Sequence, residues 1–197
     1  MSKIVTDINE LNLNGTYTYA DYLLWRFKER VELFKGKIFK MSPAPNVSHQ
    51  KVSLALTRNL DKVFHQSDCQ LFVAPFDVRL VNYKQSKEDE QIHTVVQPDL
   101  CVICDENKID TRGCVGAPDL IIEILSPGNT RKEMNIKFDL YQENGVLEYW
   151  MVDVTDRAIF MYVLENGKYI GLKPFSEESM VQSNVFPQLH FAVNNIF

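Results

Sequence analysis

The 197-residue sequence lacks long apolar runs, and this absence argues against two classes of protein. No stretch approaches the roughly 18 apolar residues that a membrane-spanning helix needs. The first 14 residues alternate polar and apolar side chains and contain no apolar run of signal-peptide length. We therefore expect neither a membrane span nor export, which predicts a cytoplasmic protein.

Glycine, proline and cysteine are also scarce, at 8, 8 and 4 residues. Together with 45% hydrophobic and 24% charged residues, these low counts argue against collagen-like and disordered chains. A chain of this length can bury a core without disulfide staples. The cysteines form no obvious disulfide framework, which suits a reducing compartment; they are Cys69, Cys101, Cys104 and Cys114.

Cys101 and Cys104 form a C-x-x-C pattern, which is found in zinc and redox sites. Both lie in an apolar stretch that reads as a buried strand, where residues three apart point to opposite faces. No second C-x-x-C follows, and free cysteines are commonly buried. We favour core cysteines and keep a metal or redox site as the alternative.

The length and the hydrophobic periodicity predict a single domain over residues 1–197, either α/β or α+β with a mixed sheet. A core at 47–154 carries an N-terminal elaboration, 1–46, and extra strands at 155–197. The core order is helix, strand, strand, strand, helix, strand. The expected helices are 16–30, 47–64 and 130–144, with a hairpin at 31–41 turning at Lys35-Gly36. The expected strands are 71–81, 95–104 (interrupted by Pro98), 119–125 and 147–154, with two or three more after 158 and loops at 82–91 and 105–117.

The segment 119–154 reads as strand, helix, strand, a unit that normally forms a parallel pair. Its first strand is apolar on both faces, which is typical of a central strand covered on both sides. Glu123 interrupts that apolar run, and carboxylates are almost never buried without a partner. It is either paired with a core cation or part of a metal or catalytic site.

Asp99 opens the preceding strand, so Asp99 and Glu123 can face one side of the sheet if the two strands are neighbours. Two such carboxylates repel each other unless a divalent cation or a shared proton neutralises them. Oxygen-rich sites of this kind suit Mg²⁺ or Mn²⁺.

A lysine falls where the next helix should be buried. At about 100° per residue, Lys137 lies in the middle of the apolar arc of helix 130–144. It either snorkels to the edge of that face or pairs with Glu123 or Asp99 on the sheet. Glu133 lies in the same arc, but Thr130 and Glu133 also match a capping box, and we read Glu133 as a cap.

Together, these residues and several longer stretches resemble a known nuclease group. Asp99, Glu123 and Lys137 resemble the PD-(D/E)XK nuclease superfamily. More narrowly, the sequence resembles the Uma-type family, thought to be restriction endonucleases and long catalogued as a domain of unknown function. The matching stretches are Glu32–Ile38, Met41-Ser-Pro, His49, Gln97-Pro-Asp-Leu100, Ala117–Pro127, Lys137-x-x-x-Tyr141 and Gly145–Asp153.

The resemblance implies a restriction-endonuclease-like core and metal-dependent hydrolysis of DNA. Asp99 and Glu123 would hold Mg²⁺ or Mn²⁺, and Lys137 would complete the catalytic set. Leu125 stands where the superfamily places its lysine, so the resemblance implies that the lysine has moved to the next helix, as Lys137. Glu32 and His49 match family positions and become supporting candidates, although a strand-face charge and a helix-start cap explain them equally well.

Three other readings stay open. The chain could be a binding or regulatory module that keeps the fold without cleavage, a different hydrolase that uses the same pocket, or a structural protein. A nucleophilic triad is not supported, because no histidine accompanies a G-x-S-x-G pattern. Cutting two strands would favour a homodimer.

The net charge of −5 at first argues against a DNA partner, but the charge is unevenly distributed. Residues 1–65 carry 10 basic and 6 acidic residues, a balance of +4, whereas 66–197 carry 11 and 20, a balance of −9. A local basic patch attracts a polyanion better than net charge does. We expect DNA binding that is weak, metal-assisted and reduced by salt. The expected contacts are Arg26, Lys28, Arg30, Lys35, Lys37 and Lys40.

Overall fold

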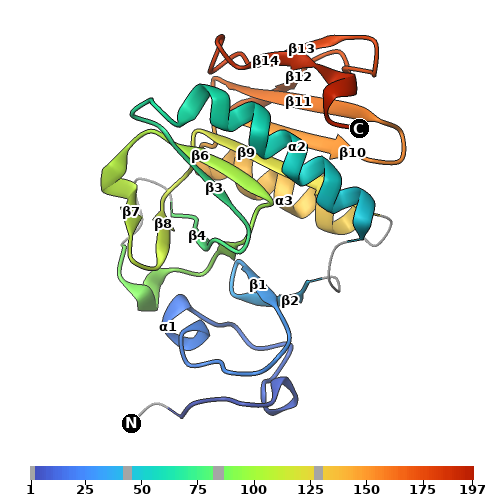
Figure 1. Ribbon diagram of the computed structural model, residues 1–197. Coiled ribbons are helices and arrows are strands. Elements are labelled where there is room, and N and C mark those ends of the chain that lie inside the picture. Colours follow the sequence, from blue (N-terminus) through green and yellow to red (C-terminus); the bar gives the residue numbers. More distant parts are fainter. Residues whose placement is uncertain (1–2, 42–45, 82–86, 127–130) are drawn as a thin grey trace.

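A computed structural model describes residues 3–41, 46–81, 87–126 and 131–197. Over these ranges the chain forms two six-stranded sheets, one two-stranded sheet and three α-helices (Figure 1). No helix in the described ranges is both long and apolar enough to cross a membrane. Part of the Met41-Ser-Pro match, part of the loop expected at 82–91 and the cap expected at Thr130 lie outside the described residues.

The main sheet has the strand order β12-β11-β10-β9-β6-β3. The inner strands β9 and β10 run parallel, and α3 connects them, as the sequence predicts. The strand bounds are β3 Gln70–Val73, β6 Leu100–Ile103, β9 Leu120–Leu125, β10 Glu148–Asp153, β11 Ala158–Glu165 and β12 Lys168–Gly171. The predicted order of helix, three strands, helix and strand is therefore confirmed for this sheet.

Two helices cover the main sheet. Helix α2, Val47–Phe64, has the predicted bounds and buries Leu56 and Leu60 in a cluster with residues from β6, β9 and β10. Helix α3, Arg131–Asn144, buries Leu140 and Tyr141 in a second cluster. Because neighbouring residues of each strand enter different clusters, the two helices pack on opposite faces of the sheet.

A second sheet, with the order β2-β1-β5-β4-β8-β7, adds to the face that carries α3. Its hairpin turns at Lys35 and Gly36, both at positive φ, as a two-residue turn requires, and this prediction is confirmed. The strand bounds are β1 Val31–Phe34, β2 Lys37–Lys40, β4 Val78–Arg79, β5 Val95–Val96, β7 Ile109–Asp110 and β8 Gly113–Val115.

Two predictions of secondary structure are wrong because they missed strands of the second sheet. The strand expected at 71–81 divides at Pro75 into β3 and β4, which belong to different sheets. The loop expected at 105–117 contains β7 and β8, which pair with each other and extend the second sheet. The strand at 95–104 divides at Pro98 into β5 and β6, where the sequence placed the interruption.

The prediction of an N-terminal helix at 16–30 is also wrong for most of its length. Helix α1 covers only Tyr19–Tyr22, and a capping box between Thr18 and Asp21 starts it. The chain then becomes extended, because backbone hydrogen bonds join Val5 to Leu24 and Arg26 to Val5. Long-range pairing has replaced the local helical pattern.

The C-terminal part contains four strands, where two or three were expected. After β11 and β12, the strands β13, Met180–Gln182, and β14, His190–Ala192, form the two-stranded sheet. They pack on the α2 side of the main sheet through Val181 and Phe191. Four short 3-10 turns complete the described elements: η1 Ile8–Glu10, η2 Asp89–Gln91, η3 Glu106–Lys108 and η4 Val193–Asn195.

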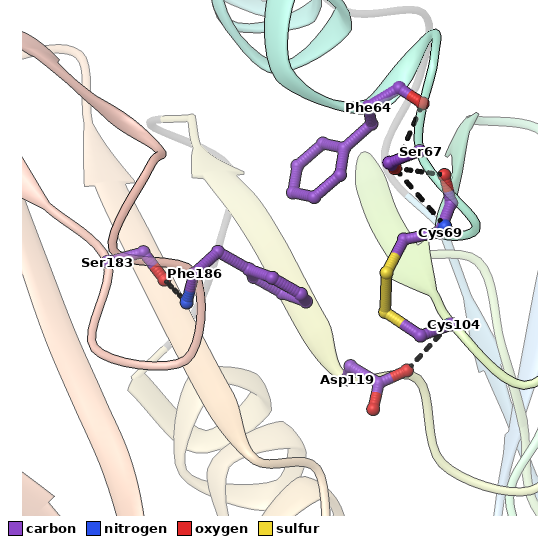
Figure 2. Close-up of a disulfide and its surroundings, with 7 residues drawn as sticks. All are labelled: Phe64, Ser67, Cys69, Cys104, Asp119, Ser183 and Phe186. Atoms are coloured by element: carbon purple, nitrogen blue, oxygen red, sulfur yellow. Dashed lines mark hydrogen bonds between the residues drawn. A yellow bond between two sulfur atoms is a disulfide. The ribbon is translucent and has the colours of Figure 1, made fainter.

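Two of the four cysteines are paired, which corrects the expectation of no disulfide framework. Cys69 and Cys104 form a disulfide at one end of the β3–β6 pair, and the Cys104 amide donates to Asp119 (Figure 2). The register Gln70↔Ile103 places the two flanking cysteines opposite each other. Cys101 and Cys114 are buried and free. Cys101 and Cys104 pack against different clusters, as strand alternation predicts.

Breaking the Cys69–Cys104 disulfide should destabilise the protein. The bond closes a sequence separation of 35 residues, so its loss should lower the free energy of unfolding by about 2–4 kcal/mol. Urea unfolding with and without a reductant measures this, and the Cys69→Ser/Cys104→Ser double variant should be insensitive to the reductant. An unchanged midpoint for the reduced wild-type protein would contradict the prediction.

Candidate active site

Glu123 is held on the α3 side of the main sheet. Its neighbours Ile122 and Ile124 pack into the α2-side cluster, so the alternation of β9 directs Glu123 to the other face. Glu123 is 9% exposed, and Lys137 and Tyr141 of α3 donate hydrogen bonds to its carboxylate. The apolar strand therefore delivers a buried carboxylate to the space between sheet and helix.

Lys137 is the cation opposite Glu123. Its Nζ lies 2.9 Å from Oε1 of Glu123 and 3.1 Å from Oε1 of Glu32, which comes from β1. All three residues are buried. The expected partnership of Lys137 with a carboxylate on the sheet is confirmed, and Glu32 joins the same cluster.

Tyr141 lies one helical turn after Lys137 and binds the same carboxylate oxygen. Its hydroxyl donates to Oε1 of Glu123 at 2.5 Å. Both donors therefore contact Oε1, and neither of them occupies Oε2. The sequence contained a signal for this contact, because residues four apart share one helix face, but Tyr141 was not among the predicted site residues.

Asp99 reaches the same site from the residue before β6. Its Oδ2 accepts a hydrogen bond from the backbone amide of Ile124, the residue after Glu123, at 2.8 Å. Its Oδ1 lies 3.3 Å from Nε2 of His49, in the first turn of α2. His49 is 7% exposed, and within the described part of the chain its Nδ1 has no hydrogen-bond partner. His49 is therefore a direct neighbour of the Asp99 carboxylate as well as a residue of the first turn of α2.

The cluster combines three carboxylates with Lys137 and His49, and the hydrogen bond to Asp99 raises the pKa of His49. Burial raises the pKa of Glu123, Lys137 opposes that effect, and the negative charges of Asp99 and Glu32 raise the pKa further. Burial alone would lower the pKa of Lys137, but Glu123 and Glu32 outweigh it and hold that pKa above its usual range. Glu123 and Glu32 thus contact one firmly protonated lysine, and the nearby Asp99 adds a third negative charge, an arrangement that a bound cation would stabilise.

These side chains line one cavity of about 230 Å³. The cavity combines the five catalytic and supporting candidates, Glu32, His49, Asp99, Glu123 and Lys137, with Arg30, Gln97, Ser126 and Glu133 among others. Glu133 lies at this cavity, whereas the cap proposed for it depends on Thr130, outside the described residues. Gln97, which the sequence analysis did not assign a role, holds Glu32 through a 2.8 Å backbone hydrogen bond.

The donor set fits a magnesium-type ion with few protein ligands. Within the described ranges, no group of three or more His, Cys, Asp or Glu residues is arranged to hold a metal. Mg²⁺ is often held by one or two carboxylates and completes its octahedron with water and phosphate oxygens. Asp99 and Glu123 supply such a pair at a water-accessible cavity.

The six expected DNA contacts are spread over different surroundings. Arg30 lines the cavity, where its NH2 donates to the Gln97 side chain at 2.7 Å. Lys35 forms an ion pair with Glu143, and Lys37 donates to backbone carbonyls of the N-terminal segment. Arg26, Lys28 and Lys40 are exposed and do not line this cavity in the described part of the chain.

Fold and site together define a mixed α/β protein with a carboxylate–lysine cluster between the sheet and its crossover helix. The same fold occurs in a crystal structure described as a "putative nuclease belonging to DUF820" from Anabaena variabilis. The two share 19% identity and a TM-score of 0.70, over 92% of this chain and 97% of that chain. This similarity establishes the fold.

The chain belongs to the Uma2 family, described as "Putative restriction endonuclease", whose sequence model matches residues 19–194. The resemblance noted from the sequence is thereby confirmed. The chain is also 28% identical to the uncharacterized protein slr1290 of Synechocystis sp. over 181 residues, which are 90% of this chain and 89% of that protein.

Proposed function

We propose that the protein is a Mg²⁺- or Mn²⁺-dependent endonuclease that hydrolyses phosphodiester bonds in DNA. The observation that carries the proposal is that Asp99, Glu123 and Lys137 line one cavity, although they come from the residue before β6, from β9 and from the crossover helix α3. Membership of a family described as restriction endonucleases supports the choice of DNA as the substrate.

Asp99 and Glu123 are the residues that would hold the metal. A bound Mg²⁺ or Mn²⁺ supplies a Lewis acid for the phosphoryl oxygen and lowers the pKa of an attacking water. The backbone of Ile124 fixes Asp99, and Tyr141 with Lys137 fixes Glu123. The two carboxylates are thus oriented before any ligand arrives, which reduces the reorganisation that catalysis requires.

Lys137 has one donor left for the reaction. Its ammonium carries three N–H groups, and two of them serve Glu123 and Glu32. The third can orient the attacking water and offset the charge that develops on the phosphate. Because both carboxylates keep Lys137 protonated, this role does not depend on proton uptake when substrate binds.

The test is a cleavage assay on supercoiled plasmid, linear duplex and single-stranded DNA. Purified protein should cut at least one of these with Mg²⁺ or Mn²⁺ and none of them in EDTA. A protein that binds DNA and Mn²⁺ but cuts no form would refute the nuclease assignment and favour the non-cleaving module.

Removing the Tyr141 hydroxyl should weaken the site without removing any of the proposed catalytic residues. A hydrogen bond to a charged group contributes about 1.5–3 kcal/mol, so Tyr141→Phe should lower the cleavage rate or the Mn²⁺ affinity by about 10- to 150-fold. The matched control is Tyr169→Phe, which removes a buried hydroxyl that donates to the Val146 carbonyl. Equal activity of the two variants would contradict the role of Tyr141.

A further inference from the structure

A second cavity lies directly beside the candidate active site. It measures about 250 Å³ and shares two lining residues with the active-site cavity, Arg30 and Gln97. The rest of its lining comes from the stretch that runs from the last residue of α1 to the first residue of β1. We call it the aromatic groove; it is lined by Tyr22, Leu23, Trp25, Arg26, Phe27, Glu29, Arg30, Val31 and Gln97.

Three aromatic rings make up one side of the groove. The rings of Trp25 and Phe27 are stacked with centroids 5.6 Å apart, and Tyr22 lies 5.5 Å from Trp25. Trp25 is buried, whereas Tyr22 and Phe27 are half-buried. The hydroxyl of Tyr22 is also tied to the Gln97 side chain at 3.2 Å. The rings are therefore held in place, and Phe27 presents an aromatic surface at the groove.

Two exposed arginines bring positive charge to the same groove. Arg26 donates from NH1 to the carbonyls of Leu23 and Trp25, and Arg30 donates from NH2 to Gln97. A guanidinium has five N–H donors, so each arginine keeps donors for an anion. Glu29 is the one acidic residue among the recorded lining residues. The groove thus combines aromatic faces with cations, the combination that binds unpaired nucleic-acid strands.

We propose that the aromatic groove binds an unpaired nucleobase next to the phosphate held in the active site, so that DNA with unpaired nucleotides is the preferred substrate. The inference rests on the proposed nuclease function. Arg30 lines both cavities and can contact the phosphate that joins the two nucleotides. A base stacked within a duplex would have to leave the stack to enter the groove, whereas an unpaired base enters without that cost.

The test compares DNA binding by wild-type protein and Phe27 variants. Anisotropy titrations at low salt in EDTA, which prevents metal-dependent cleavage, would use one labelled oligonucleotide, either single-stranded or annealed as a blunt duplex. Base–aromatic stacking contributes about 1–3 kcal/mol per base. Phe27→Ala and Phe27→Leu should therefore weaken single-strand binding by about 10-fold and duplex binding by less than about 2-fold.

Phe27→Leu removes the aromatic ring and keeps an apolar side chain, so it tests base stacking even if Phe27→Ala fails to fold. Lys28→Ala is the charge control, because Lys28 is exposed on the same segment and does not line the groove. It should weaken both DNA forms equally. Equal wild-type affinity for the two forms, or equal losses in Phe27→Leu, would overturn the groove proposal. Failure of the nuclease function would instead appear as no metal-dependent cleavage with single-strand binding intact.

Discussion

Asp99→Asn should reduce metal-dependent DNA cleavage by at least about 10³-fold. The substitution removes one of the two carboxylates that would hold the metal, and the transition-state stabilisation lost with a catalytic metal amounts to several kcal/mol. Asn has nearly the same shape and keeps an oxygen that can accept from the Ile124 amide. The free energy of unfolding should therefore change by less than about 1 kcal/mol. Cleavage rates and urea unfolding of the same preparation check both parts.

A substitution of Lys137 tests the same assignment of the catalytic site, but it should also destabilise the protein. Lys137→Met should also stop cleavage, but it leaves Glu123 and Glu32 buried without their cation. Breaking a buried ion pair by removing one partner costs about 3–5 kcal/mol. We therefore expect Lys137→Met to lower the free energy of unfolding, whereas Asp99→Asn should leave it nearly unchanged. Wild-type cleavage rates in both variants would contradict the assigned site.

Glu148→Ala should destabilise the protein more than the substitution of either Asp99 or Glu165. Glu148 begins β10 and is fully buried, and burial raises its pKa. It accepts hydrogen bonds from the indole of Trp150 and from the Ser183 hydroxyl. It also accepts from the amides of Asn184 and Val185. Leaving several buried donors unsatisfied, at about 1–3 kcal/mol each, should lower the free energy of unfolding by at least about 4 kcal/mol.

The control for Glu148 is Glu165→Ala, at the exposed end of β11 in the same sheet. A surface substitution of this kind should change the free energy of unfolding by less than about 0.5 kcal/mol. Urea unfolding curves of the two variants measure the difference. Similar midpoints would show that Glu148 does not anchor the segment before β14.

The comparison of Glu123 with Glu148 shows what the sequence could reveal about the site. Both carboxylates belong to otherwise apolar strands, Glu123 inside β9 and Glu148 at the start of β10. Only Glu123 had a candidate cation from sequence, because helical periodicity placed Lys137 on the buried helix face, with Glu123 or Asp99 as its possible partner. The backbone and hydroxyl donors of residues 183–185 lie 35 or more positions away, and no periodicity reveals them. Asp99 was also a candidate from the sequence pattern, and Glu32 and His49 were candidates from the family resemblance. The contacts of Tyr141 and Gln97 depend on packing between elements.

The same reasoning explains which elements the sequence predicted. Helix α2 and the hairpin at Lys35-Gly36 depend on local patterns, so their prediction from sequence alone is confirmed. Helix α1 is shorter than expected because Val5 pairs with the backbone around Trp25. Cys69 and Cys104 become neighbours only through the β3–β6 register. Contacts that depend on pairing between strands far apart in the sequence could not be predicted from local sequence patterns.

The most direct test of the account is the position of Mn²⁺ in a crystal of the protein. Anomalous scattering from crystals soaked with Mn²⁺ should show a peak bound by carboxylate oxygens of both Asp99 and Glu123. The same soak of Asp99→Asn crystals should lose most of that peak. No peak at this pair in wild-type crystals, while the same protein cuts DNA with Mn²⁺ in solution, would contradict the proposed metal site.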